Sequence, residues 1–164
     1  MRLGTVIAKP SWASSPGRRR NMQANRRRDT HAELAVRRLL HARGRRYRVD
    51  ARPDPSLRRR ADIVFTRQRI AVFIDGCFWH GCPEHGRKSF AHNVDYWPAK
   101  IAANVARDAD TNARLARAGW TVLRFWEHES VDLVVADIER ELGVVTSASP
   151  VVRRAKLASV DGPA

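Results

Sequence analysis

The sequence predicts an α/β fold, with a single domain and a mixed central sheet flanked by helices. The chain has 164 residues, 43% of them hydrophobic, which is enough for one hydrophobic core. Two apolar runs at 62–65 and 70–74 are separated by a short polar turn, which is typical of a β-hairpin covered on both faces. Segments with helical periodicity and capping residues precede and follow this hairpin, so we expect helices to flank the sheet.

Local signals place each element along the chain. Thr30–Glu33 forms a capping box that begins the first helix, and Gly44 ends it. Pro98 suits the first position of a second helix that Gly119 ends, and Ser130 caps a third. The expected order is a helix at 31–43, strands at 47–49, 62–65 and 70–74, an irregular stretch at 75–97, a helix at 98–118, a strand at 120–126 and a helix to about 142.

The positive charge is concentrated in the first third of the chain. Residues 1–60 contain 18 Lys and Arg against four Asp and Glu, whereas residues 61–164 contain 13 of each kind. Clustered arginines bind phosphate oxygens and release counterions, so this pattern favours nucleic-acid binding over a merely solubilising tail. We expect a flexible basic arm at 1–20, the folded domain at 21–143 and a flexible tail at 144–164.

Composition excludes several classes of protein. No apolar run is long enough to span a membrane, and the N-terminus lacks the apolar core of a signal peptide. Two cysteines are too few for a disulfide scaffold. The sequence therefore predicts a cytoplasmic protein with no membrane association.

A cysteine–histidine cluster lies in the irregular stretch after the hairpin. Two cysteines and a histidine follow the spacing C-x4-C-x2-H, and a further histidine follows the last core strand. Thiolates and imidazoles are preferred zinc ligands, and four of them form a closed structural site. Because the spacing is not that of a standard finger, buried thiols with surface histidines are the alternative. The predicted ligands are Cys77, Cys82, His85 and His128, with His80 and His92 as alternatives.

Two aspartates mark the ends of the hairpin strands. Asp62 begins one strand and Asp75 ends the next, and these ends are adjacent in an antiparallel pair. Two converging carboxylates form a site for Mg²⁺, which can activate water for attack on a phosphodiester. The alternative is that each aspartate closes a strand at a turn. The spacing resembles the metal-binding acids of restriction-endonuclease-like nucleases. Their usual lysine is replaced here by Cys77, and His80 is the nearest substitute.

The run DGCFWHGCP at 75–83 carries a wider resemblance. With its flanking motifs, it resembles the very-short-patch-repair (Vsr) family of DNA mismatch endonucleases, from about residue 21 to about residue 142. The resemblance implies a restriction-endonuclease-like fold, a structural Zn²⁺ and Mg²⁺-dependent nicking 5′ of the thymine in T:G mismatches left by deamination of 5-methylcytosine. The alternative function is a zinc-containing protein that binds mismatched DNA without cutting it. The flanking motifs are Arg28–Thr30, Glu33, Asn104, Arg107–Asp108, Gly119–Trp120 and Trp126–Glu127.

The resemblance also implies roles for individual residues. Asp62 matches the metal-binding aspartate, and Ile74 stands where a backbone carbonyl acts on Mg²⁺. Asp75 replaces a histidine of the best-known member and could be a second Mg²⁺ ligand. His80 matches the catalytic histidine, while Glu33 matches a glutamate near the active site or only caps its helix. His128 stands where that member has a zinc-binding cysteine. The residues expected at DNA are Met22, Phe78, Trp79, Trp97 and, as a contact or packing residue, Asn104.

The same resemblance implies the molecular partners. The substrate is double-stranded DNA with a T:G mismatch, the protein acts as a monomer, and it meets other mismatch-repair proteins.

Overall fold

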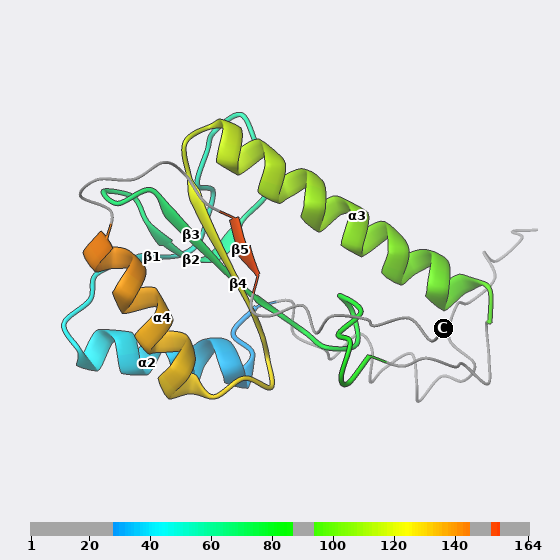
Figure 1. The fold of residues 1–164 in the computed structure, drawn as a ribbon, viewed down its shortest axis with the longest axis horizontal. Coiled ribbons are helices and arrows are strands. Elements are labelled where there is room, and N and C mark those ends of the chain that lie inside the picture. Colours follow the sequence, from blue (N-terminus) through cyan, green and yellow to red (C-terminus); the bar gives the residue numbers. More distant parts are fainter. Residues whose placement is uncertain (1–27, 87–93, 145–151, 155–164) are drawn as a thin grey trace, which may run out of the picture.

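A computed structural model describes residues 28–86, 94–144 and 152–154, and Figure 1 shows its arrangement. Helices lie on both faces of a sheet that has five strands within these residues, in the order β1-β2-β3-β4-β5. This agrees with the predicted α/β fold and mixed sheet. The elements are α2 (His31–Ala42), β1 (Arg48–Ala51), β2 (Ala61–Phe65), β3 (Ile70–Asp75), α3 (Tyr96–Arg117), β4 (Thr121–Trp126), α4 (Val131–Val144) and β5 (Val152–Arg154).

The sheet combines antiparallel and parallel pairs. Strand β2 pairs antiparallel with β1 and with β3, which confirms the predicted hairpin. Strand β3 then pairs parallel with β4, in a register from Ile70–Thr121 to Asp75–Trp126. Because parallel strands end at the same edge of a sheet, the segments that follow Asp75 and Trp126 leave side by side. This edge is where the candidate site is built.

Each face of the sheet buries its own apolar cluster. Figure 1 shows α2 and α4 together on one face and α3 on the other. The α2/α4 face includes Val36, Ile63 and Ile138, while the α3 face includes Val64 and Leu115. Every residue of β4 is buried, as expected for a strand covered on both sides.

Helix α2 begins as the capping box predicts. The Thr30 side chain accepts a hydrogen bond from the backbone N–H of Glu33, and the Thr30 hydroxyl donates to the Glu33 carboxylate. Gly44 follows the helix with a φ of 76°, a conformation that favours glycine.

The start of the second helix and the segment at 144–164 differ most from the sequence-based expectation. Helix α3 begins at Tyr96, not at Pro98. Proline is tolerated there because the N–H groups of a first helical turn have no partner within the helix. The short strand β5 at Val152–Arg154, parallel to β4, was not expected. The predicted arm at 1–20 lies outside the described residues, and the domain limits stay a prediction.

No helix in the described part of the chain combines the length and the apolar character needed to cross a membrane.

Candidate active site and metal centre

The predicted site residues gather where β3 and β4 end. The backbone N–H of Glu127 donates to the Asp75 carbonyl at 3.0 Å, which extends the β3–β4 pairing by one step. The Glu127 carboxylate then accepts from the backbone N–H of Cys77 at 2.7 Å. These two bonds join the cysteine-containing loop to the segment after β4.

Asp62 lies where the β2–β3 pairing stops. The paired residues end at Ile63 and Val72, and beyond them the Asp62 carboxylate accepts the backbone N–H of Ile74 at 2.7 Å. Burial, with the nearby charges of Glu33 and Asp75, raises the pKa of Asp62 to about 7, against the opposing effect of the Ile74 bond. A desolvated carboxylate among other acids is an environment that a divalent cation would stabilise, so these residues fit Mg²⁺.

Glu33 caps helix α2, and its charge also acts on Asp62. Its side chain is buried and accepts hydrogen bonds from the Thr30 hydroxyl and the Asp29 backbone N–H, both at 3.0 Å. The Arg37 guanidinium, one helical turn on, pairs with the same carboxylate. The capping role is therefore observed, and its charge acts on Asp62 as well.

His80 is held by Asp108, a residue that the sequence indicates only as part of a flanking motif. Its Nδ1 lies 2.6 Å from Asp108 Oδ2 on α3. Burial opposes ionisation of Asp108, but the His80 hydrogen bond and the Arg124 charge outweigh it and lower the pKa of Asp108. An ionised carboxylate can only accept, so Nδ1 carries a proton, and the neutral form of the imidazole has its lone pair at Nε2.

Asp75 is paired with an arginine from the neighbouring strand. Arg124 Nη1 lies 2.6 and 2.7 Å from the two Asp75 oxygens, and both side chains are buried. Among the described residues, Asp75, His80 and Asp108 form one of two groups whose donor atoms could share a metal. Asp62 belongs to neither group, although the charge of Asp75 reaches it. A joint Asp62–Asp75 ion therefore stays a prediction.

The second group consists of the four predicted zinc ligands. Their donor atoms lie within 4.8 Å of one another, with the cysteines buried and the histidines exposed. The parallel pairing of β3 with β4 places the segments that carry these positions at the same edge of the sheet. His80 points to Asp108 instead, and the other alternative, His92, lies outside the described residues. The residues are Cys77, Cys82, His85 and His128.

The donor types of this group suit a zinc ion. The His128 Nδ1 atom lies 3.0 Å from Cys77 Sγ and 3.8 Å from Cys82 Sγ. Tetrahedral zinc bonds of about 2.0–2.3 Å place donor atoms roughly 3.3–3.8 Å apart, so the longer separation agrees with a shared ion and the shorter one is tighter than that. The His85 backbone N–H lies 3.4 Å from Cys82 Sγ, to which it donates. Burial and the adjacent Cys82 raise the pKa of Cys77 to about 12, so a metal's charge is what would keep the Cys77 thiol ionised.

A cluster of half-buried aromatic side chains includes Phe78 and Trp79, which directly precede His80. The ring centroids of Phe78 and Trp97 are 5.3 Å apart, and those of Trp79 and Trp97 are 5.9 Å apart. Tyr96, 42% exposed, extends the cluster towards solvent. The buried Asn104 donates to the Trp79 carbonyl at 2.8 Å, so it positions this loop. Met22, which is also expected at the DNA, lies outside the described residues.

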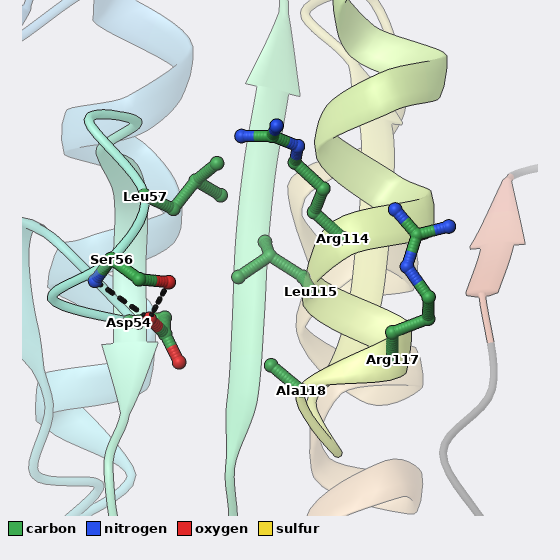
Figure 2. A pocket seen from close by; sticks show the side chains of 7 residues that line it. All are labelled: Asp54, Ser56, Leu57, Arg114, Leu115, Arg117 and Ala118. Carbon is green, nitrogen blue, oxygen red and sulfur yellow. Dashed lines mark hydrogen bonds between the residues drawn. The ribbon is translucent and has the colours of Figure 1, made fainter.

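A pocket of about 470 Å³ lies away from these residues. Figure 2 shows its lining, which comes from the end of α3 and the loop before β2 and includes no predicted site residue. Leu57, Leu115 and Ala118 form its apolar part, beside Arg114 and Arg117. The acids and histidines at the end of β3 are therefore the candidate catalytic centre, and this pocket is not.

Comparison with known proteins identifies relatives of the chain. A family model described as DNA mismatch endonuclease Vsr matches residues 13–85. The type II nicking enzyme V.NaeI of Lentzea aerocolonigenes is 51% identical over 124 residues, covering 74% of each chain. V.XorIIP of Xanthomonas oryzae pv. oryzae, also a type II nicking enzyme, is 44% identical, covering 73% of this chain and 86% of the relative. DNA mismatch endonuclease Vsr of Escherichia coli K12 is 39% identical, covering 67% and 69%.

Proposed function

The chain belongs to the Vsr family of DNA mismatch endonucleases, and we propose that it nicks DNA on the 5′ side of the thymine in T:G mismatches. Such mismatches arise when 5-methylcytosine is deaminated. The observation that carries the proposal is the His80–Asp108 pair beside Asp75, whose charge also acts on the buried Asp62. Acids that fit a divalent cation beside an oriented histidine suit phosphodiester hydrolysis.

Asp62 and the Ile74 carbonyl would hold Mg²⁺, with Asp75 as the second acid of the site. When bound, the ion polarises the phosphodiester and stabilises the charge that develops on it. His80 then accepts the proton of the attacking water at Nε2, because Asp108 fixes the proton on Nδ1. Glu33 adds negative charge beside Asp62.

The four-residue Cys/His group would hold a structural Zn²⁺. Zinc held there would have a structural role and no catalytic one, because protein ligands would fill its four coordination positions. Cys77 immediately precedes Phe78, and His80 lies three residues after Cys77. An anchor at Cys77 therefore sets where the aromatic residues and the proton acceptor lie.

The aromatic cluster would open the duplex at the mismatch. Phe78, Trp79 and Trp97 form a rigid edge, and unstacking is least costly where bases are mispaired. A wedge of this kind would distinguish mismatched from paired DNA. Met22 is proposed to insert from the other groove. Asn104 supports the wedge through the Trp79 carbonyl.

Replacing Trp97 by Ala is expected to weaken binding of a T:G duplex by roughly 5- to 100-fold, because each base–aromatic stack contributes about 1–3 kcal/mol. The KM for T:G DNA should rise more than kcat falls. Single-turnover nicking and fluorescence anisotropy measure both effects. Leu133→Ala, which removes an exposed apolar side chain from α4, is the matched control and should match the unmodified chain. Equal losses in both variants would exclude the wedge.

The proposed specificity is tested with labelled duplexes that carry each mispair or a fully paired site. We expect one nick 5′ of the thymine of T:G, in Mg²⁺ and not in EDTA, with the paired duplex uncut. Equal cutting of all duplexes would contradict mismatch specificity. Tight T:G binding without nicking in Mg²⁺ or Mn²⁺ would instead identify a non-cleaving mismatch-binding protein.

A further inference from the structure

We propose that Arg124 is a positioning residue of the cleavage site, where its guanidinium occupies the place of a second cation. It holds Asp75 and Asp108 together and thereby fixes the acid that orients His80. This inference rests on the proposed nuclease function, because it assigns a role within that reaction.

The contacts of Arg124 use every nitrogen of its guanidinium. Nη1 binds both oxygens of Asp75, Nη2 lies 3.3 Å from Asp108 Oδ1, and Nε donates to Asn112 Oδ1 at 2.9 Å. The guanidinium also lies over the Phe73 ring, 4.4 Å from its centroid. The residue is 3% exposed, so solvent does not compete for these bonds. Its side chain therefore has one well-defined position.

The burial of Arg124 in β4, a strand covered on both faces, is explained by its charged partners. The strand TVLRFW is otherwise made of apolar residues and one threonine, and burying a charge there is costly unless it is paired. Arg124 meets two buried carboxylates, Asp75 and Asp108, which would repel each other without a cation. Strand β4 therefore places the Arg124 guanidinium between Asp75 of β3 and Asp108 of α3.

The two oxygens of Asp108 are divided between two partners. Oδ1 faces Arg124 at 3.3 Å, and Oδ2 meets His80 Nδ1 at 2.6 Å. Arg124 therefore fixes the rotation of the Asp108 carboxylate and, through it, the imidazole. Arg124 contacts neither the imidazole nor Asp62 in any contact found among the described residues, so it acts through Asp108 and Asp75.

The same two acids, with His80, have donor atoms that could share a metal ion. Donor atoms of Asp75, His80 and Asp108 lie within 4.8 Å of one another. Divalent cations favour such carboxylates, and the fixed guanidinium supplies positive charge there without a metal. Removing the guanidinium should therefore leave a set of acids that recruits a cation from solution.

Conservative substitutions test the inference. Arg124→Lys retains a charge but cannot bridge both acids, so we expect kcat for nicking to fall about 10- to 100-fold with KM for T:G DNA unchanged. Asp108→Asn should lower kcat similarly. If Arg124 acts through Asp108, the double variant is no slower than the slower single variant, whereas independent roles multiply. An unchanged kcat in Arg124→Lys, or multiplying losses, would overturn the proposal.

Chemical rescue gives a second, independent measurement. In Arg124→Ala, added guanidinium at millimolar concentration should restore at least about tenfold of the lost kcat, and Mn²⁺ titration calorimetry should show one more weak site than the unmodified chain. Arg114→Ala, which removes a surface arginine paired with Asp110, is the control and should show neither effect. Absence of rescue and of the added site in folded Arg124→Ala would count against the proposal. If the unmodified chain nicks no duplex, the proposed function itself fails.

Discussion

Replacing Asp62 by Asn is expected to lower nicking at least about 100-fold, because one ligand to the divalent cation is lost and that cation contributes several kcal/mol to the transition state. The fold should be kept. Asn has the same size, and its side-chain oxygen can still accept the Ile74 N–H. Nicking rates over a Mg²⁺ titration measure the effect. Rates equal to those of the unmodified chain at every Mg²⁺ concentration would remove Asp62 from the mechanism.

The same substitution is expected to stabilise the metal-free protein. The pKa of Asp62 is raised from 3.8 to about 7, so the folded state binds this proton more tightly than the unfolded state. Its contribution to the free energy of unfolding is therefore full below about pH 4 and is lost as pH rises through 7. At pH 8 the ionised carboxylate should cost on the order of 4 kcal/mol, which Asp62→Asn removes.

Urea unfolding in EDTA at pH 5 and pH 8 measures this difference. We expect Asp62→Asn to raise the urea midpoint at pH 8 and to change it much less at pH 5. Asp54→Asn is the matched control. Hydrogen bonds from Ser56 lower the pKa of Asp54, so the linkage has the opposite sign and no stabilisation at pH 8 is expected. A loss of stability at pH 8 in Asp62→Asn would show that the carboxylate is a structural residue.

Most of the fold could be predicted because its signals are local. The Thr30–Glu33 capping box and the apolar runs of the hairpin are read from neighbouring residues, and both agree with the structure. The exact start of α3 is not predictable from Pro98, because any position of the first helical turn accepts a proline. Strand β5 has only three residues and exists through its pairing with β4, which no local pattern reveals.

The site residues also divide into those with local sequence signals and those whose positions depend on tertiary structure. Cys77, Cys82 and His85 lie close together in the sequence, but His128 meets them only because β3 and β4 are parallel and in register. Arg124 stands 49 residues from Asp75, inside an apolar run that indicates an ordinary core strand. A single arginine in such a run was the available signal, and its partners depend on a strand pairing and a helix position that the sequence leaves open.

Removing a thiol that is proposed to bind zinc is expected to have the other large effect. Cys82→Ser should abolish binding of one zinc per chain and lower the Tm by about 10 °C or more, because structural zinc contributes directly to the free energy of folding. Nicking should fall with it, since the loop that carries Phe78 and His80 loses its anchor. Elemental analysis of purified protein and thermal unfolding without Mg²⁺ separate this effect from loss of the catalytic cation.

The fourth ligand is resolved by a parallel substitution. His85→Ala should also lose zinc, because the His85 and His128 rings lie together with centroids 4.3 Å apart beside the thiols. His41→Ala, which removes an exposed histidine from α2, is the control and should keep both zinc and Tm. If His85→Ala keeps its zinc while Cys82→Ser loses it, another residue completes the site. If purified protein holds no zinc and a chelator leaves Tm unchanged, buried thiols and their packing alone hold the loop, and the Cys/His group is not a metal centre.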